Sequence, residues 1–378
     1  MKKKREIFIL CSIIVFFFAC KGSEGKHKDV IENVEIVAKW SFEPQQIHFS
    51  DKDETKNLLI SANTNWSVVS NKSWCSMSKE KGYYGETILK ISVERNESLK
   101  ERSAQLTFSA GKETAHFIIT QGGRIEENYV PNGYTLVFND EFNGENASSD
   151  KPTLPNAKKW QFETGDHGWG NNELQNYISG YQGNDTCAIV SDGTLKIIAK
   201  KVNSKVFSIR MNSHQSWLYG YFEARLRMPS GKGVWPAFWM LPKDFSNWPL
   251  DGEIDIMEYV GYDPNVVHCT VHTQKYNHAI DTQVVKSINV AQAETSFHIY
   301  AVEWTADYIK GFVDGKEYFR FDNDKQNNKE TWPFNVPFYL KINLAWGGNW
   351  GGAQGVDESK LPATYEIDYV RVYQKKSN

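Results

Sequence analysis

Short runs in which apolar and polar residues alternate recur along most of this chain, and they limit its fold more than any other feature. In residues 219–228 an apolar residue stands at every second position from Phe222 onward, and residues 194–199 alternate in a similar way. Successive side chains of a strand point to opposite faces, so this period places one face in a core. No long run has the spacing of an amphipathic helix. We therefore predict an all-β protein.

The alternating runs fall into two groups. Between residues 31 and 123, short runs at 66–69, 88–93, 105–109 and 116–121 are bounded by Asn, Gly, Ser and Lys. This pattern is typical of a small antiparallel sandwich, so we predict an immunoglobulin-like domain over 31–123. A polar segment at 122–129 follows it. Residues 124–378 again contain many short strands and no convincing helix, which predicts a large jelly-roll sandwich.

The N-terminus has the composition of an export signal. The basic sequence MKKKR precedes an apolar run of 14 residues at 7–20, which is shorter than the roughly 20 residues that a transmembrane helix needs. A basic start and a short apolar run are typical of a secretory signal peptide, predicted here over 1–19. The ending FFAC resembles a bacterial lipobox, which implies cleavage before Cys20 and lipidation of its thiol. A plain signal peptide and a buried helix are the alternatives.

Export sets the expected surroundings of the mature chain. Residues 20–30 are polar and form the predicted tether between a lipid anchor in the outer membrane and a domain at the cell surface. The remaining Cys75, Cys187 and Cys269 are odd in number and lack CxxC spacing, so we predict free buried thiols.

The net charge of the chain limits the classes of molecule that it can bind. The chain carries 43 Lys and Arg against 46 Asp and Glu, a net charge of −3. A chain so close to neutrality has no strongly basic surface, and we therefore exclude nucleic acid as a partner.

Three acids on one predicted strand indicate the chemistry. Glu253 and Asp255 are two apart and share a face of the strand, whereas Glu258 is five residues from Glu253, and a regular strand would turn it away. A β-bulge at Ile256 and Met257 adds one residue to the count and returns Glu258 to the same face. Three like charges together are costly unless one stays protonated, which favours acid/base catalysis. A solvated edge strand and a cation site are the alternatives.

The acid strand and its surroundings resemble glycoside hydrolase family 16. The matching segments are FNDEF at 138–142, GWGNNELQ at 168–175, GVWPAFWMLP at 233–242, WP at 248–249, EIDIME at 253–258, NLAWGGNW at 343–350 and IDYVRVY at 367–373. The resemblance implies that 124–378 is a catalytic jelly-roll with a glycan cleft on its concave sheet. It implies hydrolysis with retention of configuration and no catalytic cofactor. Glu253 would be the nucleophile and Glu258 the general acid/base, with Asp255 between them.

Tryptophans near these acids are predicted to bind the sugar. Trp235 and Trp239 share a strand face by parity, about 13 Å apart at four residue rises. Flat indoles suit the apolar faces of sugar rings, although burial in the core is the alternative for each. Further candidates of the same kind are Trp248, Trp346 and Trp350.

The resemblance also implies polar and metal-binding positions. The residues matched to positions that bind sugar hydroxyls are Asn172, Glu173 and Arg210. His272 follows the catalytic strand, where a hairpin-like return would place it beside the acids. A structural calcium is implied near Glu141, Gly193 and Asp368, because hard oxygen ligands suit this cation. His268 and His272 share face parity but lack a third ligand at a recognisable spacing, so no catalytic metal is predicted.

Residues 31–123 resemble a second family, the immunoglobulin-like BACON modules attached to bacterial carbohydrate enzymes. The matching features are Trp66, Trp74, RSAQLT at 102–107 and ITQG at 119–122. This segment has no carboxylate constellation, and we interpret it as a spacer.

Together these features predict a monomeric, exported endo-β-glucanase of the laminarinase branch. Its expected substrate is β-1,3-glucan, mixed-linkage β-1,3-1,4-glucan or both. A galactan hydrolase of the agarase or porphyranase type on the same scaffold is the enzymatic alternative. A non-catalytic surface protein that binds glycan is an alternative of another class, which needs the aromatic residues but not the acids.

Overall fold

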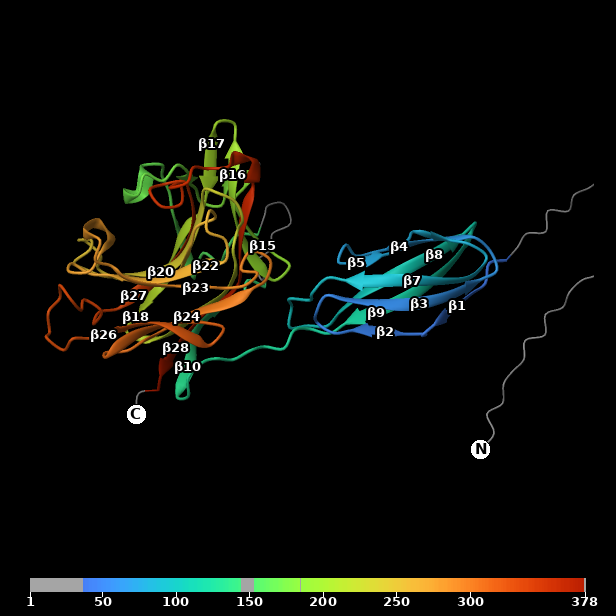
Figure 1. Cartoon of the computed structure of the whole chain (residues 1–378), viewed down its shortest axis with the longest axis horizontal. Helices are drawn as coiled ribbons and strands as arrows, with labels where there is room; N and C mark the ends of the chain where they lie inside the picture. Colours follow the sequence, from blue (N-terminus) through green and yellow to red (C-terminus); the bar gives the residue numbers. More distant parts are fainter. Residues whose placement is uncertain (1–36, 144–152, 184, 377–378) are drawn as a thin grey trace, which may run out of the picture. The chain divides into compact units, whose positions relative to one another are not determined.

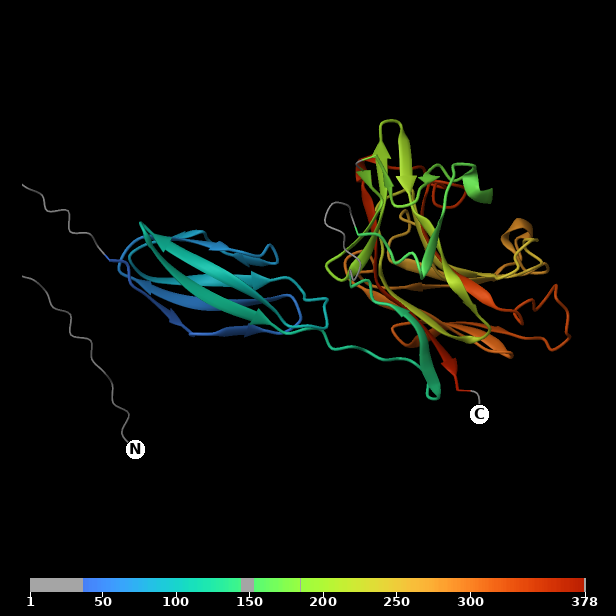
Figure 2. The same ribbon diagram turned by 180° about the vertical axis from the view of Figure 1, so that it is seen from behind.

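The computed structural model describes residues 37–143, 153–183 and 185–376. The chain divides into two compact units, Met1–Ile125 and Glu126–Asn378, drawn in blue to teal and in green to red in Figures 1 and 2. The predicted signal peptide, the predicted lipidation site Cys20 and the predicted tether lie outside the described residues. Within the part that is described, no helix has the length and apolar character needed to cross a membrane.

The first unit is a small β-sandwich, as predicted. One sheet has the order β1-β3-β7-β5 and the other β2-β9-β8-β4-β6. Alternate residues of the longer strands, such as Leu58 and Ile60 in one sheet and Leu106 and Phe108 in the other, are completely buried and form one core. The strands are β1 (Trp40–Glu43), β2 (Ile47–Phe49), β3 (Glu54–Ala62), β4 (Trp66–Ser70), β5 (Cys75–Met77), β6 (Lys81–Gly82), β7 (Gly85–Val93), β8 (Arg102–Ala110) and β9 (Glu113–Gln121).

The second unit packs two large sheets face to face, which confirms the predicted jelly-roll class. The seven-stranded sheet has the order β11-β18-β27-β20-β21-β22-β23. Its strands are β11 (Trp160–Glu163), β18 (Arg210–Trp217), β20 (Val234–Pro242), β21 (Glu253–Tyr259), β22 (Val266–His272), β23 (Val284–Asn289) and β27 (Phe338–Trp346). We call it the cleft sheet, because the site described below lies on its outer face.

The opposing sheet has ten strands, with the central order β12-β17-β16-β28-β19-β24-β25-β26 and with β10 and β15 at its sides. Its strands are β10 (Tyr134–Asp140), β12 (Asn176–Tyr177), β15 (Ala188–Ser191), β16 (Thr194–Val202), β17 (Lys205–Ser208), β19 (Gly220–Arg227), β24 (His298–Trp304), β25 (Tyr308–Val313), β26 (Lys316–Asp322) and β28 (Ala363–Lys375). A two-stranded ribbon, β13 (Tyr181–Gln182) with β14 (Asp185–Thr186), stands apart. The helical segments of the described residues are three 3₁₀ turns, η1 (Gly168–Gly170), η2 (His278–Ile280) and η3 (Glu358–Lys360).

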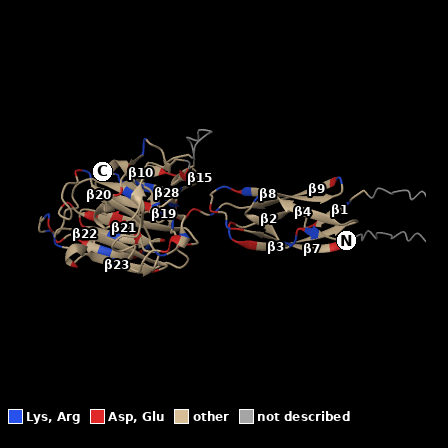
Figure 3. Cartoon of the chain, turned by 90° about the horizontal axis from the view of Figure 1, so that it is seen from above, with Lys and Arg blue, Asp and Glu red and all other residues tan. Residues whose placement is uncertain are grey.

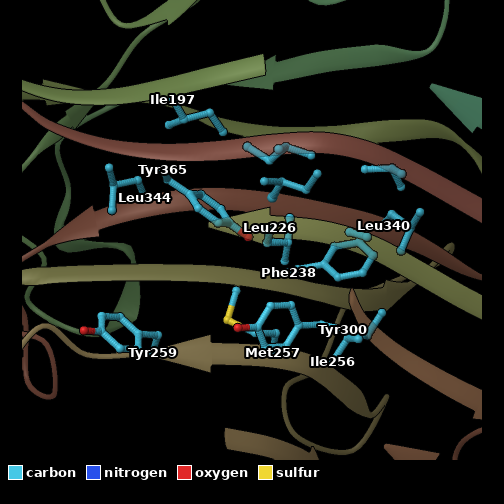
Figure 4. Close-up of a cluster of buried hydrophobic side chains, with 14 of the residues drawn as sticks. Ile197, Leu226, Phe238, Ile256, Met257, Tyr259, Tyr300, Leu340, Leu344 and Tyr365 are labelled. Atoms are coloured by element: carbon cyan, nitrogen blue, oxygen red, sulfur yellow. The ribbon is translucent and has the colours of Figure 1, made fainter. Parts of the chain in front are cut away.

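The core of this unit lies between the two sheets. Phe238 and Leu340 of the cleft sheet face Leu226 and Tyr365 of the opposing sheet (Figure 4), and all four are completely buried. Full burial of a large apolar side chain contributes about 1.5–3 kcal/mol, so a core of this extent holds the sheets together without cross-links.

The cysteines and the surface charges agree with the sequence. Cys75, Cys187 and Cys269 are free and buried, as predicted. Acidic and basic residues are interspersed over both units in the view of Figure 3, which fits a net charge of −3.

Candidate active site

The acid-bearing strand β21 lies between β20 and β22 in the cleft sheet. Ala237 and Trp239 of β20 are two residues apart, but they pair with Glu258 and Asp255, which are three apart. The register between β21 and β22 shifts over the same stretch. One extra residue therefore bulges from β21 at 256–257, which confirms the bulge predicted from the spacing of the acids.

The bulge sends the two kinds of side chain on β21 to opposite faces. Ile256 and Met257 are completely buried in the core between the sheets, where Figure 4 shows them. Glu253, Asp255 and Glu258 line a cleft on the other face of the cleft sheet. The backbone thus gathers three carboxyl groups at one place without exposing the core.

The cleft is a cavity of about 320 Å³ with aromatic walls, which is within the usual size of a ligand site. Four indoles line it, those of Trp169, Trp235, Trp239 and Trp248. Its polar lining includes Asn171, Glu173, Arg210, His278 and Asn343.

Two of these indoles hold the carboxylates. The Nε1 of Trp235 donates a hydrogen bond to Oε1 of Glu258 at 3.1 Å, and Nε1 of Trp248 donates to Oε2 of Glu253 at 3.2 Å. His272 lies behind them, with its Nε2 at 3.3 Å from Oδ2 of Asp255 and 3.9 Å from Oε1 of Glu253. Each acid therefore has a fixed neighbour that limits its orientation.

All three carboxyls favour their protonated forms. Burial raises the pKa of Glu253 to about 8, and the charge of Asp255 adds to the shift. Burial also raises the pKa of Glu258 to about 7, although His272 opposes the shift. Burial and the charge of Glu258 hold the pKa of Asp255 well above its usual range. At neutral pH the cluster therefore retains a proton, which a general acid requires.

Comparison with known proteins identifies the family and the fold. The sequence profile described as "Glycosyl hydrolases family 16" matches residues 175–371. The chain belongs to this family. A profile described as "Viral BACON domain" matches residues 39–124, which confirms the resemblance of the first unit.

The relatives agree with the assignment. A "Beta-glucanase" of Rhodothermus marinus is 46% identical over 64% of this chain and 85% of the relative. The solved laminarinase of the same organism is 45% identical, with a TM-score of 0.59 over 65% of this chain and 98% of that chain. Two structures of SCLam, a "non-specific endo-beta-1,3(4)-glucanase from family GH16", are 43% identical, with TM-scores of 0.59 and 0.60 over 65% of this chain and 93–96% of that protein.

Most of the predicted sugar-binding residues of this family 16 site line the cleft. They are Trp235, Trp239, Trp248, Glu173 and Arg210. Glu173 is nearly buried, with 7% of its surface exposed, and its Oε2 accepts hydrogen bonds from Gln175 and Tyr177. Glu173 therefore also braces the wall of the cleft.

Three predicted residues are not among those that line the cleft. His272 is buried beneath the carboxylates, and Asn172 donates to Oδ1 of Asn349 at 2.8 Å. The ring of Trp350 packs edge-on against Trp235, with ring centroids 5.5 Å apart. These contacts place the three residues next to the lining, and their contact with sugar stays a prediction.

The prediction that Trp346 forms a sugar platform is wrong. Only 1% of its surface is exposed, and it belongs to the core between the sheets. Along β27, Asn343 and Ala345 line the cleft, so the even-numbered Leu344 and Trp346 must face the other way. The same parity rule would have identified Asn343, whose Oδ1 accepts a hydrogen bond from Trp239 at 2.7 Å.

Two other residues that line the cleft cannot be identified from the alternation of apolar and polar residues. Trp169 has a positive φ of 52°, which no local pattern of apolar residues predicts. His278 belongs to the short turn η2 and lies against Trp248, with ring centroids 4.8 Å apart. Both come from loops, where alternation carries no information.

The calcium ligands implied by the family are not supported. Glu141 accepts hydrogen bonds from Nε and Nη2 of Arg371, both at 2.8 Å. Asp368 accepts one from Nη1 of Arg225 at 2.9 Å. These arginines neutralise the two carboxylates, and Gly193 offers backbone atoms alone, so the set Glu141, Gly193 and Asp368 does not fit a cation site as arranged here.

One group of acids and a histidine could hold a metal ion. In the described ranges it consists of Glu253, Asp255 and His272, whose ligand atoms lie within 4.8 Å of one another. Both of these acids also line the cleft.

Proposed function

We propose that this family 16 enzyme hydrolyses internal linkages of β-1,3-glucan and mixed-linkage β-1,3-1,4-glucan, with retention of anomeric configuration. The observation that carries the proposal is the bulged strand, which gathers Glu253, Asp255 and Glu258 in one cleft walled by indoles. The linkage is taken from its relatives, which include a "Glucan endo-1,3-beta-glucosidase A1" of Niallia circulans, 36% identical over 65% of this chain and 38% of that protein.

Hydrolysis proceeds in two displacements. In the first, protonated Glu258 gives its proton to the glycosidic oxygen while a carboxylate oxygen of Glu253 bonds to the anomeric carbon, and the glycosidic bond breaks. In the second, the Glu258 carboxylate takes a proton from water, whose oxygen bonds to the anomeric carbon and displaces Glu253. One water is consumed for each bond cut, both groups return to their starting states, and no cofactor takes part.

The surroundings of each acid suit these roles. Burial raises the pKa of Glu258 to about 7, so it is largely protonated below neutral pH. The pKa of Glu253 is raised by burial and by the charge of Asp255, whereas His272 and Arg210 lower it. Asp255, at 3% exposure, lies between the two glutamates on the same strand face, and a proton held on Asp255 removes the charge that disfavours the attacking anion of Glu253.

Stacking and hydrogen bonds hold the polysaccharide. A neutral glucan offers hydroxyls and apolar ring faces, and the cleft offers indoles with amide and guanidinium groups between them.

Product analysis on three substrates tests the proposal. Laminarin, cereal mixed-linkage glucan and agarose are incubated side by side, and reducing ends and the anomer first formed are measured by NMR. Internal cleavage of the two glucans with a β-anomer as first product is expected. Cleavage of agarose alone would overturn the substrate and point to a galactan hydrolase, the class of a relative named "Keratan-sulfate endo-1,4-beta-galactosidase", 28% identical.

A binding protein without activity is the other outcome that would overturn the proposal. A relative 31% identical is named "Beta-1,3-glucan-binding protein". Retention of glucan without release of reducing ends would place this chain in that class and would leave the three carboxyls without a role.

We also infer that the enzyme is exported and acts as a monomeric outer-membrane lipoprotein at the cell surface, with the BACON-like unit as a spacer. The support is the basic and apolar start, the FFAC ending at Cys20 and the polar residues after it. Cys20→Ser should release the protein from the membrane fraction and abolish labelling by fatty acid. Cys11→Ser, a matched change within the signal, should do neither.

A further inference from the structure

A lysine lies fully buried beneath the aromatic wall of the cleft. Lys341 of β27 has 0% of its surface exposed. Its Nζ donates hydrogen bonds to Oε2 of Glu163 at 2.8 Å and to Oδ1 of Asn212 at 2.7 Å. Burial, helped by the charge of Arg210, lowers the pKa of Lys341 to about 7. Burial of an ammonium group destabilises the folded protein, and an apolar side chain of the same length would destabilise it less.

The acid that pairs with Lys341 serves two cations. The same Oε2 of Glu163 also accepts a hydrogen bond from Nε of Arg210. Burial by itself would raise the pKa of Glu163, but the charges of Arg210 and Lys341 outweigh it and lower the pKa to about 2. With both cations charged, the cluster carries an excess of positive charge around the completely buried Lys341.

Indole rings compensate for this excess. The guanidinium carbon of Arg210 lies 4.6 Å from the ring centroid of Trp169 and 4.9 Å from that of Trp239. The Nζ of Lys341 lies 5.1 Å from the Trp239 centroid. Cations at these distances are attracted to the electron-rich face of an indole, more strongly where water is excluded. The two cations therefore tie both rings to the acid Glu163.

Strand register explains why these groups meet. Glu163 pairs with Arg210 across β11 and β18, Asn212 with Lys341 across β18 and β27, and Lys341 with Trp239 across β27 and β20. Paired residues on neighbouring strands point to the same face, here the cleft face. Arg210, Trp169 and Trp239 line the cleft, whereas Lys341 does not.

We propose that Lys341 is a positioning residue for sugar binding: through Glu163 and Arg210 it fixes the Trp169 and Trp239 indoles that receive the glucan on the β18–β27 side of the carboxylates. The proposal depends on the glucanase function given above, because a glucan must occupy this side of the cleft. Lys341 itself touches no sugar, so its loss should weaken substrate binding while the chemical step proceeds.

The test compares Lys341→Met and Glu163→Gln with the wild type on laminarihexaose. Both variants should raise KM about tenfold, the size of a lost charge-assisted hydrogen bond, with kcat within about twofold of wild type. Binding of laminarihexaose by the Glu253→Gln protein, which cannot turn over, should weaken by the same factor when Lys341→Met is added.

The matched control is Lys310→Met on β25 of the opposing sheet. Lys310 also pairs with an acid, Glu317 at 2.8 Å, and lies 5.1 Å from the ring centroid of Tyr308. Its replacement should leave KM unchanged.

Three results would overturn the proposal: an unchanged KM in folded Lys341→Met and Glu163→Gln proteins, a fall in kcat with KM unchanged, or an equal rise of KM in the control. The thermal unfolding midpoint of every variant is recorded, and the KM of Glu163→Gln decides the test where Lys341→Met does not fold. Failure of the proposed function would look different, because the wild type would then release no reducing ends from any β-glucan.

Discussion

Asp251 connects the stability of the catalytic unit to the position of Trp248, and its replacement should reveal both effects. Its Oδ2 accepts hydrogen bonds from the backbone N–H of Ser246 at 2.9 Å and of Asn247 at 2.7 Å. Its Oδ1 accepts one from Nζ of Lys329 at 2.6 Å. The loop held in this way carries Trp248, whose indole N–H bonds the proposed nucleophile.

The size of the expected loss of stability follows from the pKa of Asp251. Burial opposes ionisation of Asp251, but Lys329 and the two backbone N–H groups lower its pKa from 3.8 to about 2. A difference of almost two pKa units corresponds to about 2 kcal/mol of stability. Because the folded pKa is depressed, this stability is present above the ordinary pKa and is lost as the pH falls toward 2.

Asp251→Asn removes the charge while it keeps the shape. At pH 7 the free energy of unfolding of the catalytic unit should fall by about 2 kcal/mol, or the midpoint by about 4–8 °C for a unit of this size. Between pH 4 and pH 2 the difference from wild type should shrink. The kcat should fall as well, because the loop that carries Trp248 loosens.

Urea and thermal unfolding, followed by tryptophan fluorescence across pH, measure the effect. A double-mutant cycle with Lys329→Met should show coupling between the two residues. Asp244→Asn, an exposed acid near the same loop, is the control and should change neither stability nor kcat. Equal destabilisation by Asp251→Asn at pH 7 and pH 2.5, or none at pH 7, would refute the reasoning.

Four further predictions concern the chemistry and the tryptophans. Glu253→Gln and Glu258→Gln should each abolish turnover with an unchanged circular dichroism spectrum, and near-full activity in either would contradict the assignment. The kcat should fall as the pH rises through about 7, where Glu258 loses its proton, so a flat profile up to pH 9 would exclude this acid. Trp248→Phe keeps an aromatic ring but removes the N–H on Glu253, and kcat should fall about tenfold. Trp346→Phe should instead lower the unfolding midpoint and leave KM unchanged, because Trp346 belongs to the core. A raised KM would indicate that Trp346 lines the cleft after all.

The acid strand shows which structural features can be predicted from a few consecutive residues. Period-two alternation gave the shared face of Glu253 and Asp255, and the odd offset of Glu258 required the bulge that the register of β21 displays. Both inferences use a few consecutive residues and the geometry of one strand. The same parity holds for Trp346, which stands an odd number of residues from the lining residue Asn343 and therefore faces the core.

The residues that sequence reasoning missed depend on loops or on neighbouring strands. Trp169 and His278 come from short turns without alternation. Lys341 resembles an exposed lysine in sequence, but folding leaves it at 0% exposure beside Glu163, 178 positions away in the chain.

The sequence by itself determined the class of the fold, the faces of the strands and the three acids, because alternation and bulges are set by residues within one strand. Only the tertiary structure decided that β11, β18, β27 and β20 are neighbours, and therefore that Glu163, Arg210, Lys341 and Trp239 form one cluster. Strand order depends on the burial of the whole core between two sheets, a sum over residues far apart in the chain. For this reason the catalytic acids could be identified from a single segment, whereas the support beneath the sugar-binding wall required the folded protein.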